Sequence, residues 1–296
     1  MPFCAKSKAV MFKKLITLII PILIFNACEA WNKDETIPSY LYIAPIQMNV
    51  LGHQGTANQA FKDAWVFVDS QYVGAYELPA SIPVLNHGRV EVKIFAGIRN
   101  NGSITNPIIY PMTDPYITTV ELEEQKTDTV FPTVHYSSDI VFPFIENFDH
   151  LHYFNFDKDN NQETKVILSN TNDAFEGSNS GLIELTSARN YLEAWFDYDR
   201  PIPYGPNSVY IELNYKSTIP FNIGLVGFKA GETESKFIDG VVLPKSSWNK
   251  VYFEFKDIVN NYKGNAYRVA LAAFYINDTT IKKQEIFIDN IKVLHR

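Results

Sequence analysis

The sequence predicts an all-β chain in which two β-sandwich domains follow an N-terminal export segment. Apolar residues occur in short alternating or continuous runs separated by turn residues, and no run keeps a helical period over any length. The composition is globular and rich in aromatic side chains, with 46% hydrophobic, 14% aromatic and 20% charged residues. The start of the chain differs from the rest, because lysines there precede an apolar run that ends at a cysteine.

The apolar run at residues 15–28 reads LITLIIPILIFNAC and follows Lys13 and Lys14. Positive charge, an apolar core and a small residue before the end are typical of a secretory signal, and the run is too short to span a bilayer. Its last four residues, FNAC, resemble the lipobox of bacterial lipoproteins. The resemblance implies that residues 1–27 are a removed signal peptide and that Cys28 carries the lipid. The alternative is an ordinary secretory signal that is cut elsewhere.

Charge and cysteine content exclude several function classes. Residues 1–27 hold four lysines and no acidic residue, so their removal takes the net charge from -7 to -11. Nucleic acid is therefore excluded as a partner, since binding it needs a basic face. Cys4 and Cys28 are the only cysteines, and Cys4 precedes the signal core. The mature chain would thus have no disulfide, and the membrane would hold it through lipid at Cys28.

Residues 28–38 form the predicted lipidated tether. The tripeptide KDE at residues 33–35 resembles the short acidic export signal that follows the lipidated cysteine in surface-displayed lipoproteins of some outer-membrane bacteria. The alternative is a solvated tether whose charges are incidental. We therefore expect the protein at the outer membrane, on its surface or its periplasmic face.

Residues 39–134 form the first predicted sandwich. A hairpin is expected from residues 64–68 and 72–76, with a tight turn at residues 69–71. In residues 89–94 the valines and isoleucine face one side and the charged residues face the other, which marks a half-buried antiparallel strand. Further strands are predicted at residues 116–122 and 127–134.

The order VxVDxxxxGxxELPAxIPVLxxGxxEVxI in this domain resembles the small β-sandwich modules of the PEGA and immunoglobulin-like type in bacterial surface proteins. Gly74 and Gly88 stand where such modules have glycine. The resemblance implies a spacer or an interaction unit, without chemistry of its own.

After a linker at residues 135–143, the second predicted domain occupies residues 144–296 as a two-sheet sandwich without helices of note. Its strands are expected near residues 164–169, 180–186, 191–198, 209–215, 221–228, 250–255 and 268–275. The segments ENFD, WNKVYFEF and FIDNIKV resemble the β-jelly-roll carbohydrate-binding modules and their galactose-binding-like relatives. The resemblance implies non-catalytic glycan docking on one sheet and a structural calcium near Asp149 and Asp289. These two aspartates could instead cap turns.

Strand parity identifies candidate ligand-binding residues. In residues 191–198 the even positions are apolar, so the odd positions share the opposite face. In residues 209–215 the odd positions are apolar, so the even positions share the opposite face. Sugars need an aromatic plate together with carboxylate or amide groups. The candidates are Tyr191, Glu193, Trp195, Asp197, Tyr210, Glu212, Asn214 and Arg268. The alternative is that a loop, for example residues 201–206, covers Trp195 and that the carboxylates are simply solvated.

Other metal sites have weaker support in the sequence. Residues 157–163 alternate oxygen ligands as calcium loops do, but they lack the glycine and the glutamate of an EF-hand, so a solvent loop is favoured. His150 and His152 would share a strand face, without a third defined ligand.

No catalytic motif is present, and residues four apart on a strand, such as Glu193 and Asp197, lie about 13 Å apart, too far for a glycosidase pair. We therefore expect no enzyme activity. The leading hypothesis is a lipoprotein that binds a polysaccharide or another extracellular ligand. The alternatives are a structural or assembly lipoprotein that contacts envelope proteins, and a divergent hydrolase.

Overall fold

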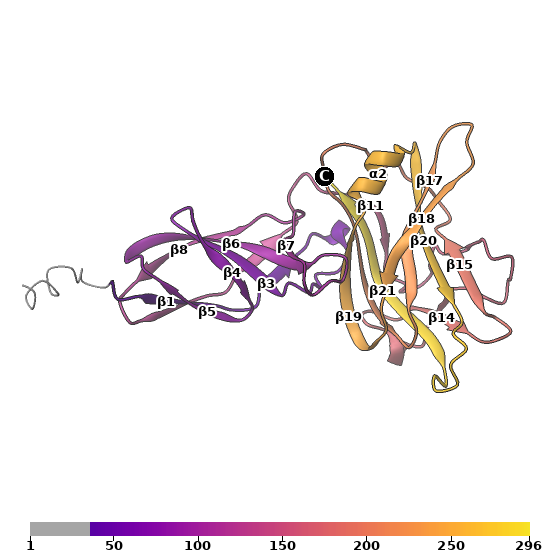
Figure 1. Ribbon diagram of the computed structural model, residues 1–296, viewed down its shortest axis with the longest axis horizontal. Coiled ribbons are helices and arrows are strands. Elements are labelled where there is room, and N and C mark those ends of the chain that lie inside the picture. Colours follow the sequence, from indigo (N-terminus) through magenta and orange to yellow (C-terminus); the bar gives the residue numbers. More distant parts are fainter. Residues whose placement is uncertain (1–35) are drawn as a thin grey trace, which may run out of the picture.

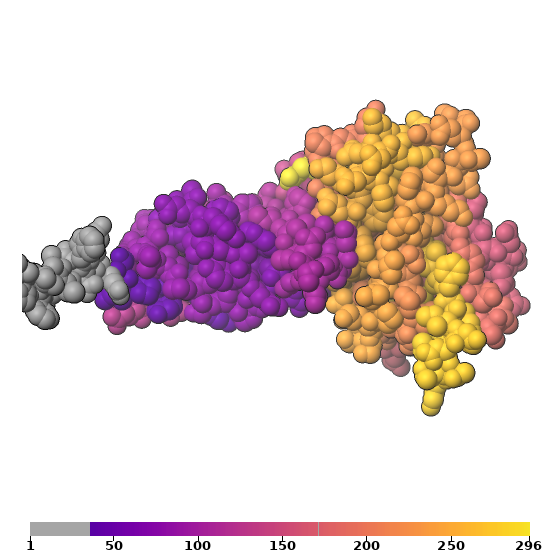
Figure 2. All heavy atoms as spheres, viewed as in Figure 1, coloured from indigo at the N-terminus to yellow at the C-terminus, as the bar shows by residue number. Residues whose placement is uncertain are grey.

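The computed structural model describes residues 36–296, so the predicted signal peptide, Cys28 and residues 33–35 lie outside the described residues. The chain forms two bodies side by side along its long axis, with β1 at one end and the second sandwich at the other (Figures 1 and 2). Both bodies consist mainly of strands, which confirms the predicted all-β class. Within residues 36–296 no helix is long and apolar enough to cross a bilayer.

The N-terminal body combines three sheets around one hydrophobic core. One sheet has the order β4-β3-β6-β7 with β8 also on β6, a second has the order β5-β1-β9, and β2 pairs with β10. The elements are β1 (Ser39–Ile43), β2 (Gln47–Asn49), η2 (Gly52–Gln54), β3 (Asp63–Val68), β4 (Gln71–Glu77), β5 (Ala80–Val84), β6 (Gly88–Arg99), β7 (Pro107–Ile109), β8 (Tyr116–Leu122), β9 (Thr127–Val130) and β10 (Thr133–His135).

Two local predictions are confirmed in this body. Strands β3 and β4 form the expected hairpin, and Asp69 and Ser70 both have positive φ, as a two-residue type I′ turn requires. In β6 the side chains of Val90, Val92 and Ile94 are all buried in the core. The alternating pattern placed these side chains correctly because successive residues of a strand point to opposite faces.

The C-terminal body is a sandwich of two sheets. The sheet that we call the β21 sheet has the order β13-β14-β21-β16-β19 with β11 also on β21, and the β20 sheet has the order β12-β15-β20-β17-β18. The elements are β11 (Val141–Glu146), β12 (Phe156–Asp157), β13 (Ile167–Leu168), η3 (Thr171–Asp173), β14 (Gly181–Leu185), β15 (Tyr191–Trp195), β16 (Val209–Ser217), β17 (Phe221–Phe228), β18 (Ser235–Val242), β19 (Lys245–Glu254), α2 (Lys256–Tyr262), β20 (Ala266–Phe274) and β21 (Gln284–His295).

Some elements of the sandwich were not predicted. Helix α2 has seven residues and buries only Val259, so its sequence carries no repeated apolar period. Strand β18 contains Asp239 and Gly240, and its register with β17 shifts between Ile223 and Leu225. A bulge of this kind breaks the alternation that identifies a strand in sequence.

The two bodies share a hydrophobic cluster. Tyr210, Tyr252 and Leu294 of the β21 sheet are buried against the core of the N-terminal body. The backbone of Asn100 also bridges to Tyr252, and the Tyr252 hydroxyl accepts a hydrogen bond from Ala60 N at 2.8 Å. One outer face of the sandwich is therefore partly covered by the first domain.

Candidate functional site

The structure divides the predicted ligand-binding residues between two sheets. Tyr191, Glu193 and Trp195 lie on β15, whose neighbours are β12 and β20. Tyr210, Glu212 and Asn214 lie on β16, which pairs with β19 and β21 in the opposite sheet. The parity assignment within each strand is correct, but the structure does not bring the two sets of candidates together. Parity is a local property, whereas the choice of sheet depends on distant strands.

Trp195 is buried, with only 1% of its surface exposed. The Phe156 ring stacks on the indole with 5.7 Å between centroids, and Lys158 Nζ lies 4.5 Å from the indole centroid. Phe228 and Ile238 pack against the same cluster. The cover thus comes from β12 and β18 and not from residues 201–206.

Two further predicted residues lie at the margin of this cluster. Asp197 follows the end of β15 and is exposed, and its Oδ2 accepts a hydrogen bond from Asn155 Nδ2 at 2.9 Å. The Arg268 guanidinium lies over the Phe156 ring at 4.6 Å and 3.7 Å from Asp199 Oδ1. Arg268 Nε and Nη1 are buried and have no hydrogen-bond partner within the described residues.

Glu193 is the polar centre of the outer face of the β20 sheet. Its carboxylate accepts hydrogen bonds from the Tyr191 hydroxyl at 2.5 Å and from Trp195 Nε1 at 2.9 Å, and Lys236 Nζ lies at 2.6 Å. Burial opposes ionisation of this carboxyl, but the hydrogen bonds from Lys236 and Tyr191 outweigh it and hold the Glu193 pKa below its ordinary value. The carboxylate is therefore charged and rigidly positioned at neutral pH.

An accessible aromatic pair lies at the end of the same face. Tyr191 and Phe274 are register partners, and their rings stack with centroids 4.5 Å apart at 26°. Phe274 is 59% exposed. Two residues along β20, Ala272 is the register partner of Glu193 on one side and of Asn222 of β17 on the other. We call this pair, with Glu193 beneath it, the Tyr191–Phe274 platform.

The platform has the chemistry that a sugar ring requires. The exposed ring offers an apolar plate, Asn222 offers an amide on the neighbouring strand, and Lys236 is held by Glu193 on the same face. Sequence reasoning missed Phe274, although the signal was available. Phe274 has the same parity as Arg268 within the strand predicted at residues 268–275.

Trp195→Phe is expected to lower the free energy of unfolding by about 1–2 kcal/mol without changing retention in polysaccharide gels, because it removes the indole hydrogen bond to Glu193 inside a closed cluster. Urea denaturation and affinity electrophoresis together check this expectation. A large loss of binding with an unchanged denaturation midpoint would contradict the structural role of Trp195.

Tyr210, Glu212 and Asn214 contact the N-terminal body. Asn214 Nδ2 donates to Asn58 Oδ1 at 2.7 Å. The Glu212 carboxylate is 2.8 Å from Lys250 Nζ, and it accepts hydrogen bonds from the hydroxyls of Tyr136, at 2.9 Å, and Tyr110. These contacts place the β16 candidates in the interface between the domains.

The charged side chains of this interface are buried next to side chains of opposite charge. Burial opposes ionisation of Glu212, but Lys250 and Lys292 outweigh it and keep the Glu212 pKa below its ordinary value. Burial lowers the pKa of Lys292 to about 8, and its Nζ donates to Thr56 O at 2.6 Å. The network joins the domains through groups that water does not reach, so each group depends on the others.

Asp149 and Asp289 both contact the turn that precedes β14. Asp149 Oδ1 accepts from Ser178 N at 2.8 Å, and Asp289 Oδ2 accepts from Ser180 Oγ at 2.8 Å. Protein donors thus already occupy oxygens that a cation would need, and among residues 36–296 no three histidine, cysteine or acidic side chains converge as a metal site. These placements do not fit a calcium site formed by the two aspartates, and calcium stays a prediction.

The other metal candidates are engaged in turns. Asp157 Oδ1 accepts from Asp159 N at 3.0 Å and from Asn160 N at 3.2 Å, so residues 157–163 cap their own backbone. His152 Nδ1 accepts from Phe154 N at 3.2 Å, while His150 is exposed.

Asp289 is expected to make the protein more stable as the pH falls. Burial raises its pKa to about 6, against about 3.9 in an unfolded chain, so its contribution is full below pH 4 and is lost as the pH rises through 6. Between pH 7 and pH 5 this group adds roughly 1 kcal/mol to the free energy of unfolding. Urea denaturation at both pH values, with Asp289→Asn as the comparison, measures the difference. An equal pH response in both proteins would contradict it.

Comparisons with known proteins give distant structural matches only. No family model matches the chain, and no curated protein matches it. The CBM22-1–GH10 modules of Clostridium thermocellum endo-1,4-beta-D-xylanase 10B, solved with xylohexaose, match 52% of this chain with 11% identity and a TM-score of 0.36. This chain covers 28% of that xylanase chain.

Two isolated modules match in the same way. The family 11 carbohydrate-binding module of the cellulase Lic26A-Cel5E of Clostridium thermocellum has 15% identity and a TM-score of 0.35, with 53% of this chain and 95% of the module covered. A family 30 carbohydrate-binding module has 11% identity and a TM-score of 0.35, with 53% and 88% covered. These proteins belong to the class that the sequence motifs resemble, but similarity this distant identifies no ligand for this chain.

Proposed function

We propose that the chain is a membrane-anchored, non-catalytic binding protein that holds a glycan on the Tyr191–Phe274 platform. The observation that carries the proposal is the exposed Phe274 ring, which a stacked tyrosine and a strand pairing fix in place. Rigid aromatic rings on sheet strands suit sugar recognition, because they bury apolar C–H faces at little entropic cost.

The polar groups beside the ring support the same function. The Glu193 carboxylate holds the Tyr191 hydroxyl and Lys236 Nζ in fixed positions, so the face is organised before a ligand arrives. Asn222 Nδ2 donates to Ile238 O at 3.2 Å, which leaves its amide oxygen to accept from a sugar hydroxyl.

The anchor belongs to the proposal as well. Residues 15–28 support lipidation at Cys28, and the KDE tripeptide at residues 33–35 supports display on the outer surface of the outer membrane. The N-terminal body then serves as a spacer between the lipid and the platform. Its buried interface with the sandwich supports a rigid spacer, one that holds the platform in a fixed orientation relative to the N-terminal body.

Affinity electrophoresis of the full-length chain through gels containing single polysaccharides tests the proposal. We expect retardation by at least one neutral polysaccharide, and loss of that retardation in Phe274→Ala. No retardation by any polysaccharide would overturn it. An envelope protein that copurifies in fixed ratio, and that Phe274→Ala releases, would overturn it in favour of the assembly function.

A further inference from the structure

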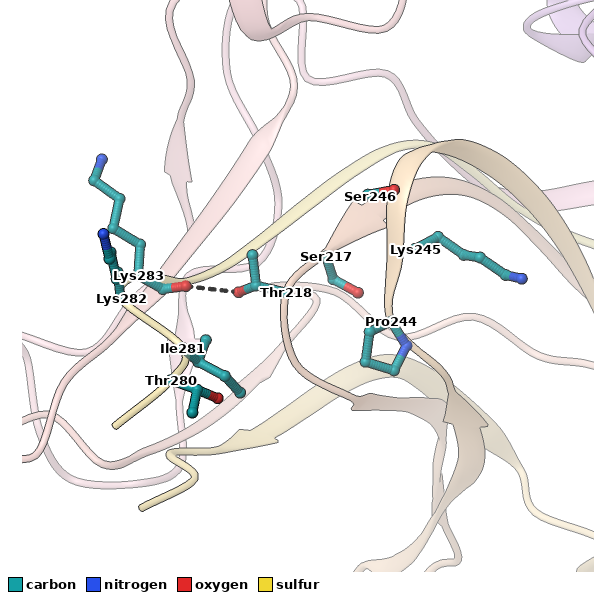
Figure 3. Close-up of a pocket in the computed structure, with 9 residues that line it drawn as sticks. All are labelled: Ser217, Thr218, Pro244, Lys245, Ser246, Thr280, Ile281, Lys282 and Lys283. Atoms are coloured by element: carbon teal, nitrogen blue, oxygen red, sulfur yellow. Dashed lines mark hydrogen bonds between the residues drawn. The ribbon is translucent and has the colours of Figure 1, made fainter. Parts of the chain in front are cut away.

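A row of lysines surrounds a group of adjoining hollows on the sandwich, at residues that the proposed platform does not use. The hollows have volumes of about 610, 320 and 290 Å³ and share lining residues. They lie where the end of β16, the start of β19 and the loop before β21 meet. In Figure 3 the Lys282 and Lys283 side chains stand on one side and Lys245 on the other, with Ser217 and Thr218 between them. We call this feature the lysine groove.

The lining of the groove carries five cations against three carboxylates, on a protein whose net charge is -7: Lys216, Lys245, Lys282, Lys283 and Arg189 against Asp173, Glu184 and Glu285. Lys245 and Lys282 are exposed, and within residues 36–296 neither lies within 4.0 Å of a carboxylate. Lys283 pairs with Glu285 at 3.0 Å, and Lys216 pairs with Asp173 at 3.5 Å. Positive side chains that no protein carboxylate neutralises attract anions to this location.

Aromatic rings continue the groove along the outer face of the β21 sheet. Lys216 Nζ lies 4.3 Å from the Phe287 centroid and 5.4 Å from the Trp248 centroid. The Phe175 ring lies 5.2 Å from that of Trp248. The rings hold the Lys216 ammonium at the wall of the groove and add apolar surface next to it.

A buried hydroxyl lies between the lysines. Ser217 is 5% exposed, and its Oγ has no hydrogen-bond partner within the described residues. In Figure 3 this oxygen points toward Pro244 and Lys245, which line the groove. A buried hydroxyl without a partner costs stability. A ligand group in the groove would satisfy it.

We propose that the lysine groove binds the carboxylate or sulfate groups of an acidic polysaccharide. Separate, unpaired cations at Lys245 and Lys282, on opposite sides of the groove, suit anionic groups repeated along a chain. The Ser246 hydroxyl and the ring of Phe287 suit the sugars that carry those groups. The groove uses none of the platform residues, although its third hollow reaches Arg189 and Tyr275, next to the ends of β15 and β20.

Affinity electrophoresis of the full-length chain through polygalacturonate and through chondroitin sulfate, at about 20 mM and about 300 mM NaCl, measures binding and separates carboxylate from sulfate ligands. We expect retention by one of the two at low salt and its loss at high salt. Lys245→Gln/Lys282→Gln is expected to weaken retention at least tenfold. Ser217→Ala is expected to weaken it at least threefold without lowering the melting temperature, because no protein hydrogen bond is lost.

Lys126→Gln/Lys263→Gln removes the same charge at exposed positions away from the groove and is expected to retain binding. Loss of retention in this control, or unchanged retention in either groove variant, would overturn the proposal. Displacement by glycerol phosphate at concentrations where galacturonate and sulfated sugars displace nothing would also overturn it, in favour of a phosphate headgroup. Phe274→Ala is expected to keep acidic retention, so failure of the platform and failure of the groove are separately visible.

Discussion

Glu212→Ala is expected to lower the free energy of unfolding by about 3–5 kcal/mol, because it removes the carboxylate from a buried ionic network. The Lys250 and Lys292 side chains are almost fully buried beside it, and the Tyr136 and Tyr110 hydroxyls donate to it. Without Glu212, two buried ammonium groups lose their counter-charge and two phenols lose their acceptor. Leaving charge unpaired costs more than the pair itself contributes.

Urea denaturation of the full-length chain measures the loss. Glu123→Ala is the matched control, since Glu123 also pairs with a lysine, Lys126, but both side chains are exposed. We expect the control to change stability by less than about 1 kcal/mol. Equal effects of the two substitutions would show that the interface between the domains does not depend on the Glu212 network.

Phe274→Ala is expected to weaken glycan binding roughly tenfold or more, which corresponds to about 1.4 kcal/mol of binding free energy. The substitution removes the accessible ring of the platform and leaves Tyr191 and Glu193 in place. Because Phe274 is 59% exposed, the cost in stability should stay below about 1 kcal/mol. Affinity electrophoresis reports binding, and urea denaturation reports stability.

Phe131→Ala serves as the control for the platform. Phe131 is 71% exposed and lies in the N-terminal body, so its loss removes a comparable exposed ring elsewhere. Glycan affinity is expected to be unchanged in this variant. If both substitutions weaken retention equally, the effect reflects general surface hydrophobicity and the platform has no specific role.

Much of the strand arrangement was predictable because its signal is local. The alternation in residues 89–94 placed Val90, Val92 and Ile94 correctly in the core, and the turn at residues 69–71 placed the first hairpin. Helix α2 and strand β18 were not predictable in this way, since one is short and the other contains a bulge. In neither segment do apolar residues repeat over enough positions for the element to be identified from the sequence.

The candidate site was likewise predictable only where the signal is local. Parity placed Tyr191 and Glu193 on one outer face, and in the structure both belong to the platform. It also singled out Trp195, but could not show that Phe156 and Lys158 cover this ring, because they come from a separate segment. Phe274 was missed, since its importance depends on pairing with Tyr191 across the sheet.

By itself, the sequence determined the all-β class, the acidic net charge, and the side that faces the core in the strands at residues 89–94, 191–198 and 209–215. These follow from composition and from the alternation of neighbouring side chains, which covalent geometry imposes. Only the tertiary structure decided that β15 pairs with β20 while β16 joins β21, and that the first domain covers Tyr210 and Glu212. Strand partners and domain contacts join residues far apart in the chain, and no local pattern encodes which distant surface will cover a given face.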